Sequence, residues 1–185
     1  MIYRFSLISD EVDMFLREIQ INSDATFLDF HKAILESVGY PDDQMTSFFV
    51  CNEDWEKETE ITLEDMGGSY SDVDTYVMAE TALEEFIEDE KQRLIYVFDP
   101  PAERMFFIEL SEIITGKTLN APKCAKKNGE PPVQTLDFDQ LMNLQPTGNE
   151  EIDDIFRDDQ DFDISELDPD GIDIIDDGFN PSDLL

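Results

Sequence analysis

Two side chains suited to acid–base chemistry stand out in this sequence, His31 and Asp99. His31 is the only histidine in 185 residues, and imidazole has an unperturbed pKa close to neutrality. If the fold brings His31 within hydrogen-bonding reach of Asp99, the pair could form the site of a small enzyme. In the alternative, which we favour, His31 only bridges core and surface through one satisfied nitrogen.

Cys124 lies within a cluster of lysines that holds a third of the positive charge. Nearby lysines lower the pKa of a thiol and favour the nucleophilic thiolate. No base lies nearby in the sequence, so a packed, unreactive cysteine is the favoured interpretation. The lysines could dock an acidic ligand or the chain's own tail, and we favour intramolecular screening. They are Lys117, Lys123, Lys126 and Lys127.

A run of carboxylates near the end of the sequence resembles a calcium-binding loop. Glu166, Asp168 and Asp170 stand at loop positions 1, 3 and 5, Gly171 at position 6 and Asp177 at position 12. The usual loop has Asp at position 1 and a bidentate Glu at position 12. In a segment this rich in aspartate the pattern arises easily by chance. We therefore expect neither a specific metal site nor a cofactor.

The charge of the chain argues against several classes of partner. Forty-six acidic residues face twelve basic ones, a formal net charge of −34. Nucleic-acid binding needs clustered Lys and Arg that release counterions from phosphates, and anionic membranes repel such a chain in the same way. We expect no direct nucleic-acid partner and no membrane partner. A basic protein is the favoured partner, and mimicry of nucleic acid in another protein's basic groove is an alternative.

Cysteine usage and hydropathy indicate a cytoplasmic protein. Cys51 and Cys124 are too few for a disulfide framework and belong to no C-x-x-C motif. The N-terminal segment lacks the apolar region of a secretory signal. No apolar run approaches the roughly 18 residues that a membrane span needs.

The first part of the sequence predicts a β-hairpin. Residues 2–8 are rich in β-forming side chains, and residues 12–21 continue the pattern after a turn at 9–11. The apolar alternation suggests a shift of face or a β-bulge near Arg17 and Glu18.

Residues 26–38 predict the main helix. Apolar side chains recur at helical spacing along one face. Thr26 and Asp29 fit a capping box at its start, and Gly39 fits the C′ position after its end.

Further strands are predicted in antiparallel pairs, which with one main helix gives an α+β fold. Trp55 is expected to be a half-buried anchor in a charged connection. The predicted elements are strands at 46–51, 93–99 and 105–114, a charged connection at 53–60, a short strand or turn at 61–66, a short helix at 82–90, a connection at 100–102, an irregular segment at 115–135 and a last helical turn at 138–144.

The sequence divides into a domain, residues 1–145, and an acidic tail, residues 146–185. The tail repeats short pieces in which acidic and apolar residues alternate. Such a segment repels itself and buries little apolar surface, so we expect it to be mostly disordered. Two roles stay open for it: it keeps the protein soluble, or it carries a short motif that folds on a basic partner.

Several stretches, taken in order, resemble the plasmid pRiA4b ORF-3-like family, also labelled as passenger proteins of insertion elements. The resemblance covers about residues 2–145 and implies a fold that opens with a hairpin followed by a helix. The stretches are Phe30-His31-Lys32-Ala33-Ile34, Gly39-Tyr40, residues 44–48, residues 96–106, and Pro122-Lys123-Cys124 with the later Pro131-Pro132.

The departures from the family pattern concern its polar residues. The resemblance implies three histidines and two aspartates, of which His31 and Asp99 are present. Gln44, Ala102 and Phe106 occupy the other positions. Two groups are too few for a transition-metal site, which needs about three protein ligands. The resemblance therefore implies a fold without an activity.

These observations favour a cytoplasmic accessory or protein-interaction module whose acidic tail meets a basic partner. A small enzyme with a reduced site at His31 and Asp99 is the alternative from a different class. A nucleic-acid mimic is the third interpretation.

Overall fold

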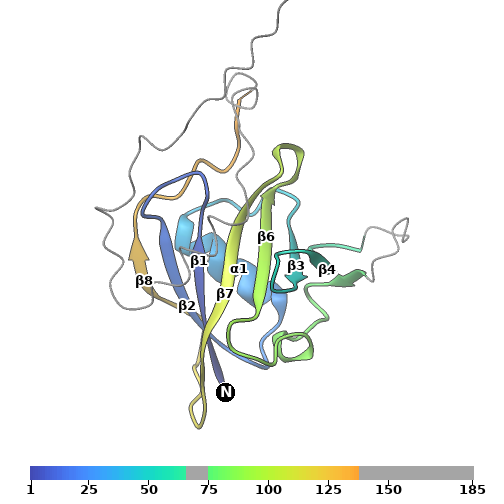
Figure 1. Cartoon of the computed structure of the whole chain (residues 1–185), viewed down its shortest axis with the longest axis vertical. Coiled ribbons are helices and arrows are strands. Elements are labelled where there is room, and N and C mark those ends of the chain that lie inside the picture. The colour runs from blue at the N-terminus through green and yellow to red at the C-terminus, as the bar shows by residue number, and fades with distance from the viewer. Residues whose placement is uncertain (66–74, 138–185) are drawn as a thin grey trace, which may run out of the picture.

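The structure, a computed structural model, describes residues 1–65 and 75–137. In this part of the chain one α-helix packs on a sheet of eight strands (Figure 1). All neighbouring strands are antiparallel except β4 and β5. The predicted α+β class, with an N-terminal hairpin and one main helix on the sheet, is confirmed for the described residues.

The sheet has the order β5-β4-β3-β6-β7-β1-β2-β8, so that β5 and β8 lie at its two edges. Two single turns of 3-10 helix, η1 (Leu83–Glu85) and η2 (Pro100–Ala102), lie in connections. The strands are β1 (Ile2–Ile8), β2 (Leu16–Asn22), β3 (Ser47–Cys51), β4 (Lys57–Thr62), β5 (Thr75–Val77), β6 (Arg93–Asp99), β7 (Arg104–Ile114) and β8 (Lys123–Asn128).

The helix α1 (Phe27–Val38) begins and ends as its sequence predicts. Oγ1 of Thr26 accepts a hydrogen bond from the amide of Asp29 at 3.1 Å, and Oδ2 of Asp29 accepts one from the amide of Thr26 at 3.1 Å. This capping box satisfies two amides at the helix start. Gly39, at φ 72°, donates its amide to the Leu35 oxygen at 2.8 Å and ends the helix.

The main core lies between α1 and one face of the sheet. Phe30 of the helix stacks on Phe5 of β1 and on Phe48 of β3, with ring centroids 4.5 and 5.3 Å apart. Burying a side chain of this size stabilises a fold by about 1.5–3 kcal/mol. A smaller apolar cluster occupies the opposite face, where Trp55 meets Phe107 at 5.1 Å. Trp55 is 4 % exposed, so the prediction that it is half-buried is wrong.

The hairpin differs from its prediction at the second strand. β2 begins at Leu16, and its side chains alternate regularly, with Arg17 on the buried face beside Ile19. Arg17 therefore occupies a core position in a regular strand, where the sequence pattern predicted a shift of face or a β-bulge. The register shift lies in the pairing with β8, where Glu18 faces Lys126 and Ile19 faces Cys124. The extra residue is on β8.

Three further predictions need correction. Residues 123–128 form β8, although 115–135 was predicted to be irregular. Residues 57–62 form β4, although most of this range was predicted to be a charged connection. The helix predicted at 82–90 is only the single turn η1. The short strands form because a neighbouring strand pairs with them, which overrides their weak local pattern.

None of the helices in the described residues is long and apolar enough to span a membrane. The predicted helical turn at 138–144 and the acidic tail from residue 146 lie outside the described residues.

Candidate functional site

His31 lies on the sheet-facing side of α1 and is fully buried. Its Nδ1 is 2.8 Å from Oη of Tyr96 on β6 and 3.3 Å from Oγ1 of Thr46. Its Nε2 is 3.1 Å from Oδ1 of Asp42, in the loop after the helix. Both ring nitrogens therefore have side-chain partners, where one satisfied nitrogen was expected.

The hydrogen bonds define the protonation of this cluster. A carboxylate accepts hydrogen bonds, so Nε2 of His31 carries the proton that points to Asp42. Nδ1 of the neutral ring then accepts the hydrogen of the Tyr96 hydroxyl. Burial raises the pKa of Tyr96, which keeps the phenol protonated. Burial lowers the pKa of His31, and the hydrogen bond to Asp42 opposes this shift only in part. His31 is therefore neutral at pH 7.

The order Asp42–His31–Tyr96 has the pattern of a proton relay, but it ends inside the core. Tyr96 is fully buried, and its ring lies 4.8 Å from Phe48 and 6.4 Å from Phe106. A general acid or base has to reach the proton that it transfers. A hydroxyl enclosed in this way instead satisfies a buried imidazole and stabilises the contact between α1 and β6.

Asp99, at the end of β6, belongs to a second network. Its Oδ2 is 3.2 Å from Nη1 of Arg104, a side chain that is 3 % exposed. Nε and Nη2 of Arg104 bind the carboxylate of Glu11 at 2.9–3.0 Å. Nη1 and Nη2 also donate to the backbone oxygens of Gln134 and Val133 at 3.2 and 2.6 Å. Burial lowers the pKa of Arg104, but the bonds to Glu11 and Asp99 outweigh it, so that the pKa is raised.

The described residues contain no hydrogen bond between His31 and Asp99. The partners of these two side chains are Asp42, Thr46 and Tyr96 in one network and Arg104 in the other. Sequence reasoning missed all four partners. The charged residues in the turns next to each element were the available signal, since Asp42 follows α1 and Arg104 follows the turn after β6.

The residues at the other positions of the family pattern have the following surroundings. Nε2 of Gln44 donates to Oδ1 of its neighbour Asp43 at 3.1 Å, Ala102 ends η2, and the Phe106 ring lies 4.6 Å from the Phe98 ring in the core. In residues 1–65 and 75–137, no group of three or more His, Cys, Asp or Glu side chains could hold a metal ion.

The calcium-loop-like pattern cannot be placed in this fold. It lies outside the described residues and consists of Glu166, Asp168, Asp170 and Asp177.

The lysine cluster lies at one edge of the sheet. Lys123, Lys126 and Lys127 are exposed residues of β8, and Lys117 is exposed in the connection before this strand. Cys124 is a free, partly buried thiol whose Sγ is 3.2 Å from the backbone oxygen of Lys126. The cluster is therefore a basic edge strand on an otherwise acidic protein.

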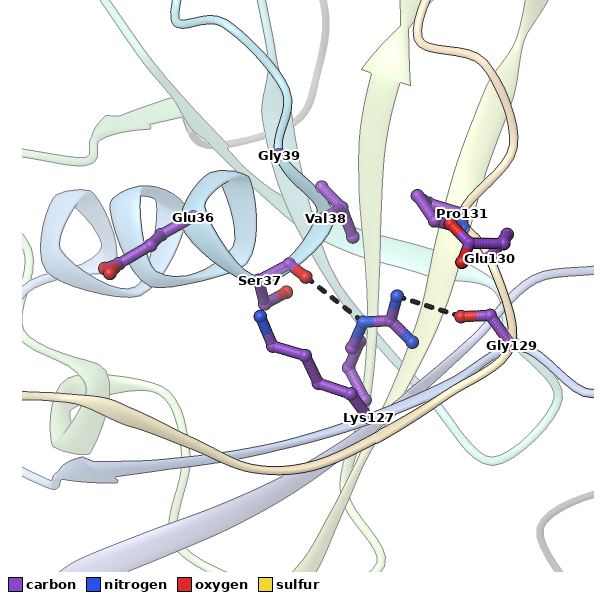
Figure 2. A pocket seen from close by; sticks show the side chains of 9 residues that line it. Glu36, Ser37, Val38, Gly39, Lys127, Gly129, Glu130 and Pro131 are labelled. Atoms are coloured by element: carbon purple, nitrogen blue, oxygen red, sulfur yellow. Dashed lines mark hydrogen bonds between the residues drawn. The ribbon is translucent and has the colours of Figure 1, made fainter.

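A hollow of about 560 Å³ separates the end of α1 from the end of β8 (Figure 2). Arg17 lines it and is 4 % exposed. Its guanidinium donates to the backbone oxygens of Ser37, Asn128 and Gly129 at 3.2, 2.7 and 3.0 Å, and the side chain of Lys127 extends toward Ser37. A positive charge beside the last carbonyls of a helix is favourable. Arg17 thus ties the helix end to β8.

A family model described as plasmid pRiA4b ORF-3-like protein matches residues 3–171. This match passes residue 145, where the resembling motifs end. Among solved structures, the protein of unknown function MM3350 from Methanosarcina mazei Go1 is similar, with a TM-score of 0.53 and 18 % identity over 68 % of each chain. At this identity the likeness concerns the fold alone. No curated protein matches the chain.

Proposed function

This chain belongs to the plasmid pRiA4b ORF-3-like family, as its motifs predicted, and we propose that it is a non-catalytic accessory protein of the cytoplasm that binds a basic protein partner. One observation carries the proposal: both candidate acid–base groups are occupied within the fold. His31 is bonded through both ring nitrogens, and Asp99 is bonded to Arg104. We therefore propose that the chain acts through its surface.

The surface that we propose for the partner is an acidic rim at one end of the sheet. The rim comprises two segments that flank the start of β6. Cys51, the last residue of β3, is opposite Arg93, the first residue of β6, and the Arg93 guanidinium lies 4.9 Å over the Trp55 ring. This contact joins Trp55, in the first segment, to the start of the strand that follows the second segment. Their exposed carboxylates are Glu53, Asp54, Glu56, Glu58, Glu84, Glu85, Glu88, Asp89 and Glu90.

The tail adds to this negative surface in the proposal. Residues 150–185 contain a single basic residue, Arg157, among many acids. The net negative charge of the chain would attract a basic partner as it approaches. Because screening at physiological salt acts over about 8 Å, only the charges close to the partner would then hold it. The same charge disfavours direct binding to nucleic acid.

The cytoplasmic location in the proposal is supported by the cysteines. Cys51 and Cys124 are free thiols, and Cys51 is buried. Unpaired thiols are typical of proteins in a reducing compartment.

The test compares a rim variant with a matched control after affinity capture from native cytoplasm. The captured partner is purified and titrated with the chain at low and physiological salt. Glu58→Gln/Glu88→Gln/Asp89→Asn should weaken binding by about tenfold, and the salt dependence should fall. Asp13→Asn/Glu36→Gln/Glu103→Gln changes the net charge equally on exposed sites away from the rim and should leave affinity nearly unchanged. Equal effects of the two variants would remove the rim from the proposal.

A further inference from the structure

The strand β8 is a preformed template at the edge of the sheet. In the described part of the chain it pairs with β2 alone. An edge strand presents unpaired amide and carbonyl groups, to which another extended segment can add. Arg17 binds the oxygens of Asn128 and Gly129 at the end of β8. In the connection before β8, the Asn22 side chain bonds to both backbone groups of Leu119 at 2.8 Å.

The charge on this edge favours an acidic occupant. The register with β2 places Lys123 and Lys126 on the face away from α1, and Lys127 opposite Arg17 on the helix side. Among the residues that the structure describes, no carboxylate lies within ion-pair distance of these three lysines.

One segment of the tail has the matching pattern. Residues 161–165, Asp-Phe-Asp-Ile-Ser, alternate polar and apolar side chains with the period of a strand. In an extended conformation Asp161 and Asp163 lie on one face, and Phe162 and Ile164 lie on the other. This pattern would set the acids beside the outer lysines and the apolar side chains toward the helix side of β8.

The other acidic pieces of the tail fit a strand less well. Residues 151–156 place two aspartates next to each other, and residues 172–179 place two isoleucines next to each other. Neighbouring side chains of a strand point to opposite faces. Each of these pairs would therefore put the same kind of side chain on both faces of the strand. The family match extends through residue 171 and so includes residues 161–165.

The chain is long enough for its own tail to reach β8. Asp161 follows the last described residue, Asp137, by 24 positions, and such a stretch can span about 80 Å when extended. A folded domain of this size has a radius of gyration of only about 14 Å. Tethering raises the effective concentration of the segment to the order of millimolar, which favours it over a second copy.

We propose that residues 161–165 add as a strand to the free edge of β8 in the same molecule, with Asp161 and Asp163 beside Lys123 and Lys126. The pairing would neutralise the basic edge and leave the acidic rim free. It does not depend on the proposed basic partner.

The first test is cross-linking to the native thiol Cys124 in the full chain. Cys124 is on the helix side of β8, opposite Ile19. Paired strands place Cα atoms about 4.5–5.5 Å apart, within disulfide range. Under mild oxidation, Phe162→Cys or Ile164→Cys should form an intramolecular disulfide about tenfold faster than the control Ile174→Cys. Cys51 does not compete, because burial raises its pKa to about 12.

The second test reverses charges in whichever of the two variants, Phe162→Cys or Ile164→Cys, forms the disulfide faster. Lys123→Glu/Lys126→Glu should slow the cross-link to the rate of the control, and so should Asp161→Lys/Asp163→Lys. Combining both pairs should restore it. Lys32→Glu/Lys57→Glu, with the same change of net charge on exposed residues of α1 and β4, should have little effect. Equal rates for the tail cysteines, or no effect of charge reversal, would overturn the proposal. Cross-linked dimers would overturn the intramolecular pairing.

Discussion

Nδ1 of His31 lies 2.8 Å from Oη of Tyr96, and this hydrogen bond joins α1 to β6 within the core. The two residues are 65 positions apart in the sequence. A buried hydrogen bond of this kind contributes about 1 kcal/mol net, and loss of one partner leaves a buried polar group that costs about 1–3 kcal/mol. The side chain best suited by type to acid–base chemistry therefore acts here as a connection between elements.

His31→Gln should lower the free energy of unfolding by about 1 kcal/mol, because glutamine retains only part of the two-sided hydrogen bonding. Urea denaturation measures this change. Tyr96→Phe is the matched variant, and a double-mutant cycle should give a coupling energy of at least about 0.5 kcal/mol. Additive effects would mean that the hydrogen bond between His31 and Tyr96 contributes nothing.

The pKa of His31 predicts a pH dependence of stability. Burial lowers this pKa in the folded state below its ordinary value of 6.5. The unfolded chain then takes up a proton at a higher pH than the folded chain does, so protonation favours unfolding. The contribution of His31 to stability is complete above pH 6.5 and is lost as the pH falls from 6.5 toward the folded pKa.

The difference in unfolding free energy between the native chain and His31→Gln isolates this effect from the many carboxylates. It should be constant above about pH 7.5 and should shrink below about pH 6.5. Urea titrations from pH 5 to 8 measure it. A difference that grows as the pH falls would show that Asp42 instead holds His31 in its charged form.

Arg104 is predicted to be the most important single cation for stability. Arg104→Met leaves the carboxylates of Glu11 and Asp99 without their partner in a site where Arg104 is 3 % exposed. Breaking a buried ion pair in this way costs about 3–5 kcal/mol. Arg4→Met is the control, since Arg4 and Glu112 form an ion pair on the surface that is worth under about 1 kcal/mol. Similar midpoints in urea for the two variants would contradict this account.

The helix was predictable because its signals are local. Thr26, Asp29 and Gly39 define its two ends, and they act within a few residues of the positions that they cap. The strongly alternating strands β6 and β7 were predictable for the same reason. The long-range partners of the candidate site residues were not, since Asp42 and Tyr96 reach His31 only after the fold has formed.

The strand β8 shows why other parts of the fold could not be predicted. Its sequence, Lys-Cys-Ala-Lys-Lys-Asn, has no apolar alternation and only one partly buried core-side position, Cys124. It becomes a strand because β2 offers an edge and because Arg17 binds the backbone oxygens at its end. Arg17 interrupts the apolar pattern of β2 and also binds the end of β8. For this reason neither the regular alternation of β2 nor the strand β8 could be predicted from the sequence.

Gly129→Ala should destabilise the fold more than Gly116→Ala does. Both glycines have a positive φ, 65° and 72°, where a side chain costs about 1–2 kcal/mol. A Cβ at position 129 would also lie 2.6 Å from the backbone oxygen of Met14, whereas one at position 116 would meet nothing within 4 Å. Urea denaturation of the two variants measures the difference. Equal losses would mean that the segment after β8 does not pack closely on the β1–β2 connection.

Affinity capture with His31→Gln and the rim variant Glu58→Gln/Glu88→Gln/Asp89→Asn, side by side with the unaltered chain, tests the central claim most directly. If the protein acts through its acidic surface, the unaltered chain and folded His31→Gln retain the same basic partner in equal amounts, and the rim variant loses most of it. If folded His31→Gln loses the partner or the biological effect while the rim variant keeps both, the claim is wrong, and the His31 network is a functional site.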